Sequence, residues 1–185
     1  MTKAQLTVLA GPTAVGKGTV VAALTKRYPA LKVSVSATTR DPRPGELNGV
    51  HYYFVSAQEF DAMIERGDML EWALVHGKNK YGTPRGPVDE ALNAGNPVLL
   101  EIDLAGARQV RANRPDAQFI FLAPPSWEEL QRRLIGRGTE GPEEQARRLA
   151  TARVELEAAS EFDHVVINDD VERAVDELAR LIGLE

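Results

Sequence analysis

The chain has 185 residues, of which 43% are hydrophobic and 26% are charged, and it has no cysteine. This composition is typical of a globular protein with one core, and it excludes a disordered chain, a collagen-like repeat, a disulfide scaffold and any site built on cysteine. The 22 basic and 27 acidic residues give a net charge of −5, which disfavours general binding to nucleic acid.

Short apolar strands alternate with helices along the chain. Periodicity, capping boxes and glycine stops predict helices at about residues 20–27, 57–66, 88–94, 104–112, 127–135, 144–159 and 171–182. Strands are expected at residues 6–10, 33–36, 51–55, 69–75, 97–102, 118–122 and 164–167. This alternation predicts an α/β fold with a mostly parallel sheet that helices cover on both faces. Residues 37–84 are more mixed, and we interpret them as a small insert.

No membrane-spanning or export segment is recognised in the sequence. No apolar run approaches the ~20 residues that cross a bilayer, and the apolar segment Leu6 to Ala10 is too short for a signal-peptide core. We therefore expect a cytoplasmic protein of about one domain, with no nucleic-acid or membrane partner. The sequence leaves the oligomeric state open, a homo-oligomer included.

A phosphate-binding loop follows the first predicted strand and precedes the first predicted helix. The pattern G-x-x-x-x-G-K is present as Gly11, Pro12, Thr13, Ala14, Val15, Gly16 and Lys17. Glycines let backbone N–H groups turn towards phosphate oxygens, the helix N-terminus adds partial positive charge, and the lysine reaches the β- and γ-phosphates. The pattern usually continues with Ser or Thr, whose hydroxyl binds Mg²⁺. This chain has Gly18 at that position, and Thr19 follows it. This order is similar to adenylate kinases, where water and the nucleotide largely hold the metal.

A second anion-binding site is suggested by the predicted insert. Arg40 and Arg43 lie three residues apart in a loop stiffened by prolines, and arginines in a fixed geometry could clamp another anionic group. Tyr52 and Tyr81 could add hydroxyl hydrogen bonds. From these residues alone, a binding site and exposed surface charges are equally good interpretations.

The order of motifs resembles guanylate kinase over nearly the whole chain. The segment Ser36–Glu46 matches S-x-T-T-R-x-P-R-x-G-E, and residues 48–54 match N-G-x-x-Y-x-F. Further matching segments are residues 70–73, 81–83, 102–106, 123–126, 136–140, 148–149 and 166–170. The resemblance implies a P-loop NTPase-type sheet with a core at residues 1–36, 85–136 and 160–185. It also implies a mixed α/β GMP-binding insert at about 37–84 and a helical lid at about 137–159.

The resemblance implies γ-phosphoryl transfer from ATP, with Mg²⁺, to GMP and to dGMP in purine nucleotide metabolism. The residues Gly11 to Thr19 and Asn168 would bind ATP, with Asn168 near the adenine. The GMP phosphate would be held by Arg40, Arg43, Tyr52 and Tyr81. The guanine would be read by Ser36, Glu71 and Thr83, with Asp103 between the two substrates. The negative charge of the phosphoryl group would be neutralised during its transfer by four residues: Lys17, Arg43, Arg137 and Arg148. Mg²⁺ would be held through phosphates and water, with Thr19 as the candidate protein ligand.

Two other functions compete with this interpretation. A non-catalytic guanylate-kinase-like binding domain is disfavoured by the intact Gly16-Lys17 pair and by the lid arginines. A P-loop kinase for another small phosphorylated acceptor is disfavoured by the guanine-facing residues. Arg132 and Arg133 are assigned to a solvated helix face, from which one of them could approach the phosphates.

Overall fold

The structure, a computed structural model, describes residues 4–136 and 139–185, so the predicted site residue Arg137 lies outside the described residues. Its central sheet has five strands, all parallel, in the order β2-β7-β1-β8-β9. The strands are β1 (Leu6–Ala10), β2 (Lys32–Val33), β7 (Val98–Glu101), β8 (Gln118–Ala123) and β9 (His164–Ile167). The parallel α/β core expected from the sequence is thus confirmed.

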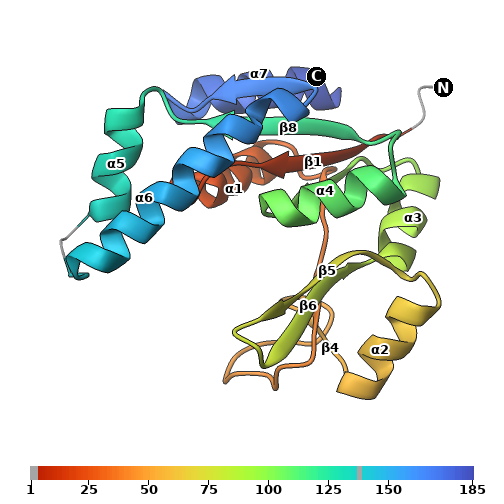
Figure 1. The fold of residues 1–185 in the computed structure, drawn as a ribbon. Helices are drawn as coiled ribbons and strands as arrows, with labels where there is room; N and C mark the ends of the chain where they lie inside the picture. Colours follow the sequence, from red (N-terminus) through yellow and green to blue (C-terminus); the bar gives the residue numbers. More distant parts are fainter. Residues whose placement is uncertain (1–3, 137–138) are drawn as a thin grey trace.

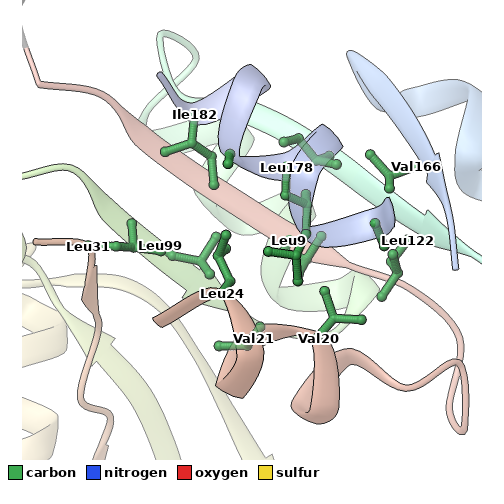
Figure 2. Close-up of a cluster of buried hydrophobic side chains, with 14 of the residues drawn as sticks. Leu9, Val20, Val21, Leu24, Leu31, Leu99, Leu122, Val166, Leu178 and Ile182 are labelled. Atoms are coloured by element: carbon green, nitrogen blue, oxygen red, sulfur yellow. The ribbon is translucent and has the colours of Figure 1, made fainter. Parts of the chain in front are cut away.

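The central strand β1 contributes side chains to two separate hydrophobic clusters, because alternate residues of a strand point to opposite faces. Leu9 packs with α1 (Lys17–Arg27) and α7 (Val171–Ile182), as Figure 2 shows. Leu6 and Val8 pack on the other face, with α3 (Arg85–Asn93) and α4 (Leu104–Asn113). All five β1 residues are buried, so β1 anchors the loop that follows it at the sheet's carboxyl edge.

A second sheet lies on one side of this core, with strand order β4-β3-β6-β5 (Figure 1). Its strands are β3 (Ala37–Thr38), β4 (Tyr53–Phe54), β5 (Met69–Val75) and β6 (Asn79–Pro84). Phe60 of α2 (Ala57–Glu65) packs with Ala37 and Met69 in a small core of its own. Ser56 caps α2 by accepting a hydrogen bond from the Glu59 backbone N–H at 3.0 Å, as its capping box predicts.

Two helices, α5 (Trp127–Ile135) and α6 (Pro142–Glu157), pack together at another end of the core (Figure 1). Leu130 and Leu134 of α5 form a cluster with Ala152 of α6. A short 3-10 helix, η1 (Ala158–Glu161), leads from α6 to β9. Within residues 4–136 and 139–185, no helix is long and apolar enough to span a bilayer.

The structure corrects three sequence predictions. Of the predicted strand at 33–36, only Val33 lies in a strand: β2 ends there, β3 begins at Ala37 in the other sheet, and residues 34–36 connect the two. The strand β6 was not predicted, because its Asn, Gly and Pro disfavour strands, yet it pairs with β5 along its length. Helix α3 begins at Arg85 rather than Val88. Pro87 fits there because the first N–H groups of a helix have no partner within it.

Candidate active site

The loop between β1 and α1 has the backbone geometry of an anion cradle. Ala14 and Gly16 adopt the left-handed conformation, with φ of 71° and 97°. For alanine this conformation costs roughly 1–2 kcal/mol, so the surrounding structure must hold the loop. A Cβ added to Gly11 would lie 2.4 Å from the Leu122 carbonyl oxygen, so glycine is required for the loop to leave β1 beside β8.

Two side chains from the C-terminal half brace this loop. The Asn168 Nδ2 group, on a residue only 5% exposed, donates to the Val15 carbonyl oxygen at 2.8 Å. Arg133 Nη1 of α5 donates to the same oxygen at 3.1 Å. Arg133 is therefore a loop contact and not a purely solvated residue. The adenine contact expected of Asn168 stays a prediction.

Lys17 lies at the start of α1 among acidic groups. Its Nζ donates to the Ile102 carbonyl oxygen at 3.1 Å, at the end of β7. Burial lowers the pKa of Lys17, and the charges of Glu101, Glu155 and Asp103 oppose this effect. A partly desolvated lysine of this kind is suited to an anionic ligand, and the phosphate contact expected of Lys17 stays a prediction.

Glu155 of α6 was not identified from the sequence as a site residue. One of its carboxylate oxygens is buried with no hydrogen-bond partner among the described residues. Burial raises the pKa of Glu155, and the Thr13 backbone N–H and the charge of Lys17 oppose this rise. Glu155 is seven residues, or about two helical turns, from Arg148, so both lie on one face of α6. That spacing was the only sequence signal for it.

The insert brings together three of the four residues predicted to hold the GMP phosphate. Arg40 makes a two-point ion pair with Glu46, with N–O distances of 2.9 and 3.0 Å. The Arg40 guanidinium lies 5.2 Å from the Tyr52 ring centroid, and the Tyr52 and Tyr81 rings are 6.0 Å apart. Glu46 thus orients the guanidinium while aromatic rings limit its movement.

Glu46 also connects Arg43 to this cluster. Its Oε1 accepts the Arg43 backbone N–H at 2.7 Å, while the Arg43 side chain is exposed. Hydrogen bonds from the Arg40 side chain and the Arg43 backbone hold the pKa of Glu46 at about 2. The carboxylate therefore stays charged at physiological pH, and it was missed from the sequence as a member of the site.

Glu71 of β5 and Thr83 of β6 face one another across the insert sheet. The Thr83 hydroxyl donates to Glu71 Oε1 at 2.8 Å, and Thr83 is fully buried. Burial raises the pKa of Glu71; the Thr83 hydroxyl opposes this effect and the charge of Asp103 adds to it. Ser36, expected beside them, lies directly before β3, and its backbone carbonyl oxygen accepts the Tyr53 backbone N–H at 2.9 Å. A half-buried carboxylate of this kind is suited to a ligand that offers N–H donors.

Asp103 connects the two halves of the site. Its Oδ1 caps α4 by accepting the Gly106 backbone N–H at 2.8 Å. Its charge also acts on the pKa values of both Lys17 and Glu71. Asp103 follows Ile102, whose carbonyl oxygen accepts Lys17 Nζ, and a Cβ on Gly106 would lie 3.1 Å from both Asp103 Oδ1 and Glu71 Oε2. The expected position of Asp103 between two ligands stays a prediction.

The arginine-bearing face of α6 opens onto the phosphate loop. Arg148 pairs with Glu140 at 2.7 Å and with Glu144 at 3.3 Å. A groove of about 330 Å³ separates α6 from the loop. It is lined by Thr13, Leu134, Glu144, Arg147, Arg148 and Thr151. An anion that extends from the loop along this groove would meet both arginines.

A family model described as guanylate kinase matches residues 3–185 of this chain. The chain belongs to the guanylate kinase family. It is 62% identical over 177 residues to a guanylate kinase of Leifsonia xyli, covering 96% of this chain and 70% of that one. It is 61% identical to a guanylate kinase of Thermobifida fusca, over 97% of this chain and 91% of that protein.

The chain also resembles a solved guanylate kinase in its three-dimensional structure. A crystal structure of guanylate kinase from Anaplasma phagocytophilum superposes with a TM-score of 0.71 and 31% identity, covering 99% of this chain and 86% of that one. A shikimate kinase from Bacteroides thetaiotaomicron shares the fold, with a TM-score of 0.51 at 14% identity, over 97% of this chain and 98% of the other. The second likeness shows the overall fold alone, and the family assignment rests on the guanylate kinases described above.

Proposed function

We propose that this chain transfers the γ-phosphoryl group of ATP to GMP, and to dGMP, giving ADP and the corresponding diphosphate. One observation carries the proposal: Lys17 Nζ donates to the carbonyl oxygen of Ile102, the residue before Asp103, and a Cβ on Gly106 would lie 3.1 Å from both Asp103 Oδ1 and Glu71 Oε2. An anion on the loop and a base on Glu71 would then face each other. Membership of the guanylate kinase family supports the same reaction.

The acceptor base is identified by the chemistry of Glu71. An ionised carboxylate accepts the ring N–H and the amino group of guanine together, whereas adenine lacks this pair of donors. Thr83 keeps one carboxylate oxygen in place, and Ser36 is proposed to complete base recognition. The GMP phosphate would be held by Arg40, Tyr52 and Tyr81. The exposed Arg43 side chain would turn towards the same phosphate when GMP binds.

The reaction needs no nucleophilic side chain, because a GMP phosphate oxygen is itself the acceptor. Catalysis would consist of alignment and charge neutralisation by Lys17, Arg43, Arg137 and Arg148. We propose that the insert at 37–84 and the lid at 137–159 close over the ligands, because water in the site would hydrolyse ATP.

When bound together with ATP, Mg²⁺ would supply positive charge that offsets the charge of the phosphates. The residues present fit this cation, which prefers oxygen ligands and retains water molecules. A Cβ on Gly18 would lie 4.0 Å from Glu101 Oε1, and Thr19 follows on the exposed first turn of α1. Glu101 and Thr19 would therefore hold the ion, directly or through its waters.

A coupled assay of ADP release tests the proposal with GMP, dGMP, AMP, CMP and UMP as acceptors. We expect turnover with GMP and dGMP and at most traces with the others. No turnover with any acceptor would indicate a binding domain without catalysis. Preference for another acceptor would overturn the assignment of the base, and the Lys17→Met variant provides the blank for contaminating kinases.

A further inference from the structure

One edge of β5 is covered by side chains of α4 instead of by another strand. β5 is the last strand of the insert sheet and pairs only with β6 within that sheet. On its outer edge, Gln109 Oε1 accepts the Trp72 backbone N–H at 3.0 Å, and Gln109 Nε2 donates to the Trp72 carbonyl oxygen at 2.8 Å. One carboxamide thus supplies both the acceptor and the donor that a neighbouring strand would supply.

A second side chain of α4 meets the strand where its pairing is irregular. The register between β5 and β6 shifts between Met69 and Glu71, so Leu70 lies in a bulge. Asn113 Nδ2 donates to the Leu70 carbonyl oxygen at 2.9 Å. Bulges bend a strand and redirect the neighbouring side chain. The bulge and the Gln109 contact therefore lie on either side of Glu71.

The same face of α4 leaves room for the Glu71 carboxylate. Gly106, Gln109 and Asn113 follow one another at spacings of three and four residues, which places them on one face of the helix. A Cβ added to Gly106 would lie 3.1 Å from Glu71 Oε2 and 3.1 Å from Asp103 Oδ1. The helix therefore holds the backbone beside Glu71 and accommodates its side chain next to the Asp103 cap.

We propose that Gln109 is a positioning residue for base recognition: by holding the Trp72 backbone, it fixes the Glu71 carboxylate relative to α4. Asn113 assists by holding Leu70. Discrimination for the 2-amino group of guanine then depends on a helix of the core as well as on the insert. This inference rests on the proposed function, in which Glu71 accepts both donors of the guanine.

The test compares GMP with IMP, which lacks only the 2-amino group. Gln109→Met keeps the length of the side chain and removes both hydrogen bonds. Loss of both hydrogen bonds frees the Trp72 backbone beside Glu71, so we expect the GMP-to-IMP ratio of kcat/KM to fall about fivefold or more, with little change in KM for ATP. The matched control is Arg108→Ala on the same helix, which removes an ion pair with Glu161 and no contact with β5. It should leave the ratio within about twofold.

A ratio in Gln109→Met within about twofold of the wild-type ratio would overturn the inference. An equal fall in Arg108→Ala would also overturn it, because the effect would then be general to α4. If Gln109→Met does not fold, Asn113→Ala is measured instead and should also lower the GMP-to-IMP ratio. An unchanged ratio in Asn113→Ala would overturn the inference. The wild-type protein in the same assay distinguishes a failure of this inference from a failure of the proposed function. If the wild type does not phosphorylate GMP, the proposed function itself is contradicted.

Hydrogen exchange gives a readout of the contact that does not depend on turnover. The Trp72 amide is protected through Gln109, so its exchange should accelerate in Gln109→Met while the amides of β1 stay protected. An unchanged Trp72 exchange rate would show that the contact does not hold the strand.

Discussion

Replacing Thr83 by valine tests whether the Thr83 hydroxyl keeps the half-buried carboxylate of Glu71 ionised and oriented for the base. The Thr83 hydroxyl donates to Glu71 Oε1 at 2.8 Å and is enclosed by protein. Valine keeps the shape of the side chain and removes this donor. A hydrogen bond to a charged group contributes about 1.5–3 kcal/mol, so kcat/KM for GMP should fall about ten- to a hundredfold.

The same substitution should change the pH dependence in a defined direction. Burial raises the pKa of Glu71, and the Thr83 hydroxyl opposes that rise. The ionised form accepts the guanine donors, so kcat/KM for GMP falls as the pH drops through this pKa. Without the hydroxyl the pKa rises further, and the acid limb of the profile moves to higher pH. The assay is kcat/KM for GMP and for ATP, measured from about pH 5 to pH 9.

Thr39→Val is the control for this experiment. Its hydroxyl lies in the insert but contacts Asn79 and the Lys80 backbone, and it does not contact Glu71. It should leave the acid limb where it is in the wild type. If Thr83→Val is folded and shows the wild-type kcat/KM for GMP and the wild-type acid limb, the role assigned to Glu71 is refuted.

The phosphate loop and helix α6 give three further predictions. Lys17→Met should reduce turnover at least about a hundredfold while leaving the circular dichroism spectrum unchanged; a folded variant with normal turnover would contradict the loop's role. Gly11→Ala should lower the free energy of unfolding in urea by about 1–3 kcal/mol or more, because its Cβ would meet the Leu122 carbonyl oxygen at 2.4 Å; unchanged stability would show that the strands separate easily. Glu155→Gln should raise the Tm of the nucleotide-free protein more at pH 8 than at pH 5, since a carboxyl whose folded pKa is raised loses its stabilising effect as the pH rises through that value. Glu157→Gln, at an exposed position of the same helix, is the matched control, and an equal rise in Tm for the two variants would contradict the account of Glu155.

The sequence predicted those parts of the fold in which local pattern and tertiary packing agree. β1 is apolar throughout, and the phosphate loop follows it directly, so strand, loop and helix were all identifiable. Ser56 and Ser126 each begin a capping box, and they are the N-cap residues of α2 and α5. In these segments, side-chain chemistry and neighbouring structure favour the same conformation.

Elements whose conformation depends on distant partners were not predicted. β6 contains residues that disfavour strands and forms because β5 supplies its hydrogen bonds. The short strands β2 and β3 lie in different sheets, and no local pattern marks the point where the chain passes between them. Arg133 contacts the phosphate loop over a separation of 118 residues. The sequence left open that Arg132 or Arg133 could approach the phosphates, but its local pattern did not distinguish between them.

Calorimetry with GMP tests most directly whether two anionic ligands bind face to face across Asp103. Titrating GMP into the folded protein, with and without a non-hydrolysable ATP analogue and Mg²⁺, should give heat in both cases and a 1:1 stoichiometry, whereas AMP should give none at the insert. The absence of GMP binding even with the ATP analogue present would contradict the account.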